Sequence, residues 1–152
     1  MSRKGGGHLA RYTHTIDAKG RVFVPARLRE GMGSSLIVTL SLDDGFLSAY
    51  SPENFRLIRE QINQLSGTDP AVRRLKRSII GEAMACEMDG QGRISVSEEL
   101  WSHINVQPGD EVCFIDMFDK LEICAKSFYQ QQKEEQGSLS GVDLSKFDVK
   151  GL

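Results

Sequence analysis

The sequence predicts a mainly β protein with short helices, of the α+β class, in which two tandem half-domains share one core. Three observations predict this class. The motif Asp-x-x-Gly-Arg occurs twice, at residues 17–21 and 89–93, so that the second copy follows the first by 72 residues. Each copy opens a short apolar strand, and no β-α-β spacing indicates a parallel sheet. Each half, of about 45 residues, is too small to be stable alone, so we expect a shared core.

The first motif predicts a tight turn that leads into a strand. The carboxylate of Asp17 can accept backbone N–H groups two or three residues further on, which closes the turn. Gly20 supplies a positive φ that other residues resist. Alternation then points Val22 and Val24 inward and places Arg21 on the outer face.

The remaining elements of the first half follow in order. Residues 25–32 have a helix-like pattern, and apolar strands are expected at 35–42 and 45–51. The break between these strands, Asp43-Asp44-Gly45, is a strong hairpin signal. A helix then begins after Ser51, an expected N-cap that is followed by proline.

The second half repeats this order. Asp89 and Gly92 are expected to form its turn, and a helix-like stretch follows at 97–104. Strands are predicted at 111–117 and 120–126, and the last helix begins near residue 127 and runs to 135. The expected domains are therefore residues 12–54 and 83–126, separated by a helical linker at 55–82 and followed by a helix and flexible tail at 127–152.

Composition favours an ordinary globular protein. Hydrophobic residues make up 39% and charged residues 26% of the 152 residues, and no apolar run approaches a membrane span. The N-terminal stretch has no apolar core and does not resemble a signal peptide, so we expect a cytoplasmic protein. The three cysteines are widely spaced, so neither a metal site nor a disulfide framework nor any other cofactor is expected.

The charge is distributed unevenly along the chain. Residues 1–30 carry seven Lys or Arg against two acidic side chains, which gives about +5, although the whole chain has a net charge of −2. Residues 94–152 carry eleven acidic side chains against five lysines, which gives about −6. A basic segment of this kind favours a polyanionic partner, and chance variation of surface charge is the alternative. The linker adds a second candidate, the arginine-rich stretch at 73–77, which could equally be a solvated helix face.

Arginine in a rigid turn suits nucleic-acid recognition, because its planar fork can bind a phosphate or the O6 and N7 edge of guanine. The alternative is that each arginine only braces its turn through an ion pair with the aspartate. We expect bracing to matter more for Arg93, which precedes the acidic segment, than for Arg21, which lies among basic residues. The predicted DNA-binding residues are Arg21, Arg93, His14, Lys19, Arg29, Arg27 and Arg11.

The stretches HTIDAKGRVFVPARLRE and TDPAVRRLKRSIIGEAMACEMDGQGRI resemble the MraZ family of bacterial transcriptional regulators, which are built from two SpoVT-AbrB-type domains. The resemblance covers roughly residues 12–130. It implies two AbrB-like half-domains that form a pseudo-symmetric β-barrel of the swapped-hairpin type. It also implies ring-like homo-oligomers larger than a dimer, and binding to short direct repeats of double-stranded DNA upstream of the division and cell-wall gene cluster. Arg21 and Arg93 match the motif arginines, and His14 and Arg29 match positions that are basic in AbrB-like DNA-binding faces.

Two departures from the family and three rival functions stay open at this stage. Ser97 replaces the proline that usually follows the second strand, and the N-terminus is longer than usual. An enzyme is disfavoured because no nucleophile–base motif or phosphate loop is present. An oligomeric scaffold that binds no DNA is a stronger rival. An AbrB-like antitoxin is also a rival, although such proteins usually carry one copy of the repeat.

Overall fold

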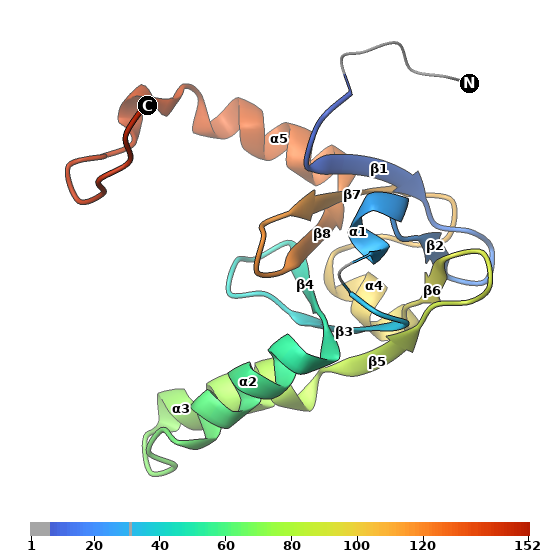
Figure 1. The fold of residues 1–152 in the computed structure, drawn as a ribbon, viewed down its shortest axis with the longest axis horizontal. Coiled ribbons are helices and arrows are strands. Elements are labelled where there is room, and N and C mark those ends of the chain that lie inside the picture. The colour runs from blue at the N-terminus through green and yellow to red at the C-terminus, as the bar shows by residue number, and fades with distance from the viewer. Residues whose placement is uncertain (1–6, 31) are drawn as a thin grey trace.

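The computed structural model describes residues 7–30 and 32–152, and the strands within them form two antiparallel sheets (Figure 1). The larger sheet has six strands in the order β1-β7-β8-β4-β3-β5, and β2 and β6 form a separate two-stranded sheet. The strands are β1 Arg11–Thr15, β2 Arg21–Phe23, β3 Ser35–Leu40, β4 Phe46–Tyr50, β5 Met84–Glu87, β6 Arg93–Ser95, β7 Glu111–Asp116 and β8 Leu121–Ala125. Bounds were predicted for four of these strands, β3, β4, β7 and β8, and the observed ends lie within two residues of the expected ones.

The helices are short and lie around this sheet. They are α1 Ala26–Arg29, α2 Pro52–Asn63, α3 Pro70–Leu75, α4 Glu98–His103 and α5 Lys126–Gln136, with a π-helical turn at Lys76–Gly81 and a 3-10 turn at Leu139–Gly141. Ser51 caps α2 as expected, since its hydroxyl accepts the backbone N–H of Asn54. The helix expected over 25–32 is shorter, and α1 has only four residues. Every residue from Gly137 to Leu152 is exposed.

The two halves are interleaved. Strand β1 of the first half pairs with β7 of the second, and β5 of the second half pairs with β3 of the first. Two further ladders, β4–β8 and β2–β6, also join one half to the other. The predicted α+β class with two AbrB-like, pseudo-symmetric halves is confirmed. The strands form two sheets, and the motif turns connect one sheet to the other.

One core lies inside the curved sheet and receives side chains from both halves. Its largest fully buried members are Trp101, Phe114, Ile16, Leu36, Leu47, Ile94, Leu121 and Ile123. A smaller cluster of Phe55, Ile62 and Ile79 fixes α2 and the π-helical turn, which together with α3 form an arm that projects from the sheet (Figure 1). Within the described residues, no helix combines the length and the apolar character needed to cross a membrane.

The π-helical turn departs from the regular helix that the spacing of Val72, Leu75 and Ile79 predicts. The backbone widens at Lys76–Gly81, and the carbonyl of Ile79 accepts a 2.7 Å hydrogen bond from the buried hydroxyl of Thr39 on β3. Ile79 is buried beside Phe55, whereas Val72 and Leu75 are only half-buried. The arm is therefore anchored to the sheet at this turn.

The turn glycine supplies the first testable prediction. Gly20 has φ +79°, in the left-handed region, and a Cβ built on it would lie 3.4 Å from the carbonyl oxygen of Val96. Gly20→Ala is expected to lower the free energy of unfolding by about 1 kcal/mol or more because of backbone strain. Gly67→Ala is the matched control, since Gly67 has no such φ and open space around it. Equal thermal unfolding of the two variants would contradict the role of this turn.

Candidate nucleic-acid interface

The two arginine turns meet on one two-stranded ribbon, formed by β2 and β6. In its register Arg21 lies opposite Ser95, Val22 opposite Ile94 and Phe23 opposite Arg93. The central pair, Val22 and Ile94, is buried in the core, so the other four side chains form the outward face. The two arginines therefore occupy diagonally opposite corners of one small surface.

Each aspartate holds both the backbone and the arginine of its own turn. Asp17 Oδ1 accepts the backbone N–H groups of Lys19 and Arg21, both at 2.9 Å, and Oδ2 accepts Arg21 Nε at 2.8 Å. Asp89 repeats these contacts with Gln91 and Arg93 at 2.9, 3.0 and 2.8 Å. Since only Nε of each guanidinium is used, the terminal Nη groups of both arginines donate no hydrogen bond within the described residues.

The ribbon joins the two turns electrostatically. Asp17 Oδ2 also lies 3.9 Å from Arg93 Nη1, so the first carboxylate faces both arginines. Backbone hydrogen bonds from Arg21 and Arg93 are the main cause that lowers the pKa of Asp17 and Asp89, and that of Asp89 falls to about 2. Both carboxylates are therefore ionised at neutral pH and keep the arginines oriented. The bracing expected mainly for Arg93 is present in both turns with the same geometry.

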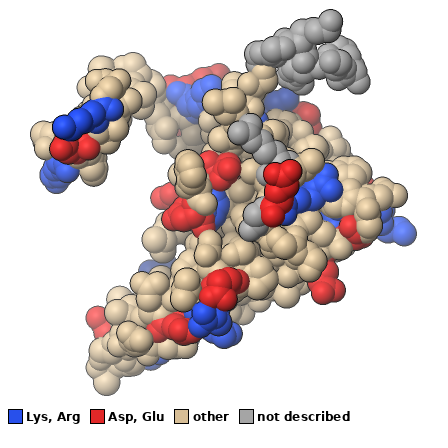
Figure 2. All heavy atoms as spheres, viewed as in Figure 1, with Lys and Arg blue, Asp and Glu red and all other residues tan. Residues whose placement is uncertain are grey.

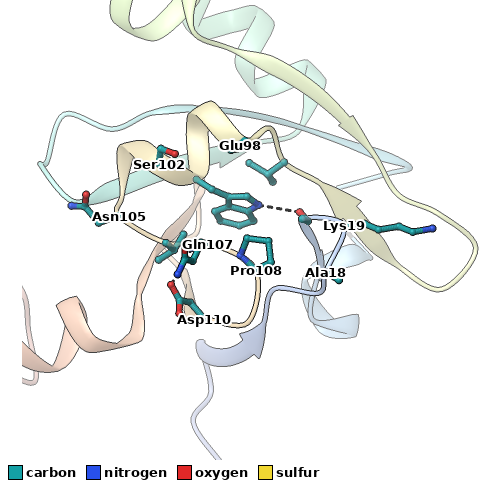
Figure 3. A pocket seen from close by; sticks show the side chains of 12 residues that line it. Ala18, Lys19, Glu98, Ser102, Asn105, Gln107, Pro108 and Asp110 are labelled. Atoms are coloured by element: carbon teal, nitrogen blue, oxygen red, sulfur yellow. Dashed lines mark hydrogen bonds between the residues drawn. The ribbon is translucent and has the colours of Figure 1, made fainter.

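Two residues at equivalent positions brace the opposite turns. Trp101, which follows Arg29 by 72 residues, donates from Nε1 to the carbonyl oxygen of Gly20 at 3.0 Å (Figure 3). Arg29 donates from Nε to the carbonyl oxygen of Val24 at 2.9 Å, and its guanidinium covers Gly92. The helix of each half thus supports the turn of the other half. The sequence predicts Arg29 as a DNA-binding residue, and only the 72-residue offset between Arg29 and Trp101 signals its bracing role.

The other predicted residues lie at different distances from the ribbon. Lys19 is exposed in the first turn at the rim of the cavity around Trp101, and its side chain points away from the other labelled lining residues (Figure 3). His14 packs between the rings of Phe23 and Phe114, at centroid distances of 6.3 and 6.4 Å. Burial lowers the pKa of His14, so this ring is neutral at pH 7 and adds shape rather than charge.

Arg11 and Arg27 contribute less to this surface. Arg11 starts β1, at the opposite end of that strand from the motif turn, and its guanidinium lies 5.0 Å from the ring centroid of Tyr129. Arg27 belongs to α1, and its side chain lies outside the described part of the structure. Phe23 was missed in the sequence, although it is 41% exposed at one corner of the ribbon.

On the face shown in Figure 2, the charge asymmetry of the sequence does not appear as two separate regions. Interleaving mixes the halves, and on the face in Figure 2 basic and acidic side chains are interspersed. The second basic candidate, the stretch at 73–77, lies on the projecting arm. There Arg73 Nη1 donates hydrogen bonds to the carbonyl oxygens of Gly67 and Thr68, at 3.1 and 3.0 Å. Arg74 and Arg77 are exposed there.

Neither metal ligands nor disulfides organise this surface. Within residues 7–30 and 32–152, no three His, Cys, Asp or Glu side chains are grouped to hold a metal ion. Cys86, Cys113 and Cys124 are free and buried in the sheet.

Comparison with known proteins gives a consistent result. The family model described as "MraZ protein, putative antitoxin-like" matches residues 9–78 and again residues 79–149. A protein of Lachnoclostridium phytofermentans named "Transcriptional regulator MraZ" is 32% identical over 141 residues, which cover 93% of this chain and 97% of the relative. Proteins with the same name from Ligilactobacillus salivarius and Natranaerobius thermophilus are 38% and 31% identical, and cover 84% and 93% of this chain and 87% and 99% of their own lengths.

The bracing carboxylates predict how stability responds to acid. Because the folded-state pKa of Asp89 lies below the ordinary value of about 4, its ionised carboxylate stabilises the fold at pH values above about 4. This contribution is lost as the pH falls toward about 2. At pH 7 Asp89→Ala is expected to lower the melting temperature more than Asp89→Asn, since the amide can still accept the backbone N–H groups.

Thermal unfolding of the wild type and both variants between pH 2 and pH 7 tests this role. Both variants are expected to lose less stability than the wild type as the pH falls, because each lacks the carboxylate that titrates. A wild-type protein whose acid sensitivity matches that of Asp89→Asn would exclude this role for Asp89.

Proposed function

The chain belongs to the MraZ family, and we propose that it is a transcriptional regulator that binds double-stranded DNA through the β2–β6 ribbon. One observation carries this proposal. Arg21 and Arg93 stand on a single antiparallel ribbon, each fixed through Nε by its own aspartate, and among the described residues their terminal nitrogens donate no hydrogen bond. The side chains of both arginines remain partly exposed, at 28% and 20%.

The shape of the element suits the major groove of DNA. That groove admits a two-stranded β-ribbon, and a guanidinium can donate two hydrogen bonds to O6 and N7 of guanine. Fixing Nε in advance reduces the rotational freedom that the long side chain loses on binding. The ribbon therefore supports base reading, whereas Lys19, a point charge at its edge, supports phosphate contact.

The carboxylates limit the strength of each single contact. Asp17 and Asp89 lie beside the arginines and weaken their attraction for phosphate, so one ribbon is expected to bind DNA modestly. Several ribbons on one assembly would overcome this limit through avidity. We therefore propose a homo-oligomer larger than a dimer, in agreement with the ring that the family resemblance implies.

The targets follow from the resemblance. We propose that the DNA contains short direct repeats upstream of the division and cell-wall gene cluster, which includes the protein's own gene. We further propose that the protein is cytoplasmic and associated with the nucleoid. No catalytic step is part of this proposal. An oligomeric scaffold that binds no DNA is the main rival, and salt separates the two, because phosphate binding weakens steeply as counterions compete.

The arginines give the direct test of DNA binding. Arg21→Ala and Arg93→Ala are each expected to weaken binding to the upstream repeats by about 1–3 kcal/mol per contacted site, since each removes one base-reading fork. Gel-shift titration on the upstream DNA and on a scrambled duplex measures the loss. The matched control is Arg56→Ala on α2, an exposed arginine that is ion-paired with Glu53 and Glu60.

Three results would contradict this assignment. Both ribbon variants could bind like the wild type, which would move the interface to the arm that carries Arg74 and Arg77. All proteins, including the wild type, could fail to prefer the upstream DNA, which would favour the scaffold. Equal losses in Arg56→Ala and in the ribbon variants would point to a non-specific charge effect.

Light scattering tests the assembly. The purified protein at micromolar concentration is expected to have a mass several times the 16.9 kDa of one chain, and Arg21→Ala is expected to keep that mass. The same measurement separates a binding defect from an assembly defect. A monomer at this concentration would exclude avidity as the source of affinity.

A further inference from the structure

We infer that the ribbon reads DNA with a fixed polarity. On one side of the ribbon Phe23 contacts the methyl edge of a thymine, and on the other side its counterpart Ser95 contacts a polar edge. This inference rests on the proposed function and specifies it further. It assigns to Phe23 a specificity-determining role that differs in chemistry from that of the arginines.

The outward face of the ribbon breaks its own symmetry at one pair of positions. When the two halves are aligned with the 72-residue offset, Arg93 corresponds to Arg21 and Ser95 corresponds to Phe23. In the register Arg21 faces Ser95 and Phe23 faces Arg93, so the four side chains form a rectangle with arginines on one diagonal. The other diagonal has an aromatic ring at one corner and a hydroxyl at the other.

Phe23 is held in position from two sides. The guanidinium carbon of Arg93 lies 5.8 Å from its ring centroid, and the ring of His14 lies 6.3 Å away. Val22 on one side and Val24 on the other are buried, so alternation keeps the aromatic ring on the outer surface. A ring that is 41% exposed between two supporting groups presents an apolar edge beside the arginine fork.

The chemistry of the DNA major groove identifies the matching ligand. Among the four bases only thymine presents an apolar group there, its C5-methyl, and phenylalanine is one of the side chains that contact it. The neighbouring arginine can donate to a guanine at the same time, so Phe23 and Arg93 together select adjacent thymine and guanine edges. Ser95 beside Arg21 can exchange hydrogen bonds with any polar edge and adds no preference for a methyl group.

The consequence is a direction on the DNA. If both halves carried the same residue, the ribbon would read a site with two-fold symmetry equally well in either orientation. With Phe23 on one side only, a repeat is bound in one orientation. Repeats that point the same way then place successive subunits the same way, and this fits direct rather than inverted repeats.

Replacing thymine by uracil, one position at a time, tests the contact without altering any hydrogen bond. Fluorescence anisotropy with labelled upstream duplexes is expected to show about fourfold weaker wild-type binding at one thymine per repeat, which is the value of one buried methyl group. Phe23→Ala is expected to bind thymine and uracil duplexes equally, and Phe23→Leu to keep part of the discrimination. Ser95→Ala, the matched control, should discriminate like the wild type.

Each remaining outcome decides the inference. It is overturned if no thymine distinguishes the wild type from Phe23→Ala, or if sensitive thymines occur as two positions related by a dyad within each repeat. A uniform loss in Phe23→Ala with unchanged discrimination would make the ring a structural support and overturn it too. If the wild type binds the upstream DNA no better than a scrambled duplex, the proposed function itself fails, and the scrambled duplex distinguishes that result from the others.

Discussion

The carboxylate of the turn aspartate is the constraint on which the rest of the candidate interface depends. One oxygen of Asp17 fixes two backbone N–H groups and the other fixes Arg21, so the loop conformation and the arginine direction are set by one side chain. Gly20 makes the turn accessible through its positive φ. Asp89 repeats this arrangement. Because the same group closes the turn and aims the guanidinium, binding geometry is built during folding.

Interleaving of the halves explains why two such turns are needed in one chain. The backbone N–H of Val24 donates to the carbonyl of Gly92 at 2.9 Å, and that of Val96 donates to Gly20 at 3.4 Å. Neither strand of the ribbon therefore has its partner within its own half. The helices α1 and α4 reinforce this exchange, since Arg29 and Trp101 each support the turn of the other half. A single half would leave these backbone and aromatic groups without partners.

Local signals in the sequence predicted much of this structure. The strands, the hairpin at Asp43–Gly45, the Ser51 cap and the doubled turn all depend on neighbouring residues, so the sequence carries them directly. The pairing partners depend on long-range register, which alternation alone does not specify. For this reason the diagonal of Arg21 and Arg93 emerged only in three dimensions, whereas the alternation that points Val22 and Val24 inward already indicates that Phe23 faces outward. The π-helical turn was missed because the buried bond from Thr39 overrides the regular helix spacing.

Duplication within one chain permits a divergence that a symmetric dimer of identical halves cannot reach. In such a dimer any substitution appears on both sides of the two-fold axis. Here tryptophan stands at 101 where the first half has Arg29, and serine stands at 95 where the first half has Phe23. The first difference supports the two turns by different means, a guanidinium over Gly92 and an indole hydrogen bond to Gly20. The second reaches the outer surface, where it gives one ribbon two chemically distinct ends, the basis of the orientation proposed for it on asymmetric DNA.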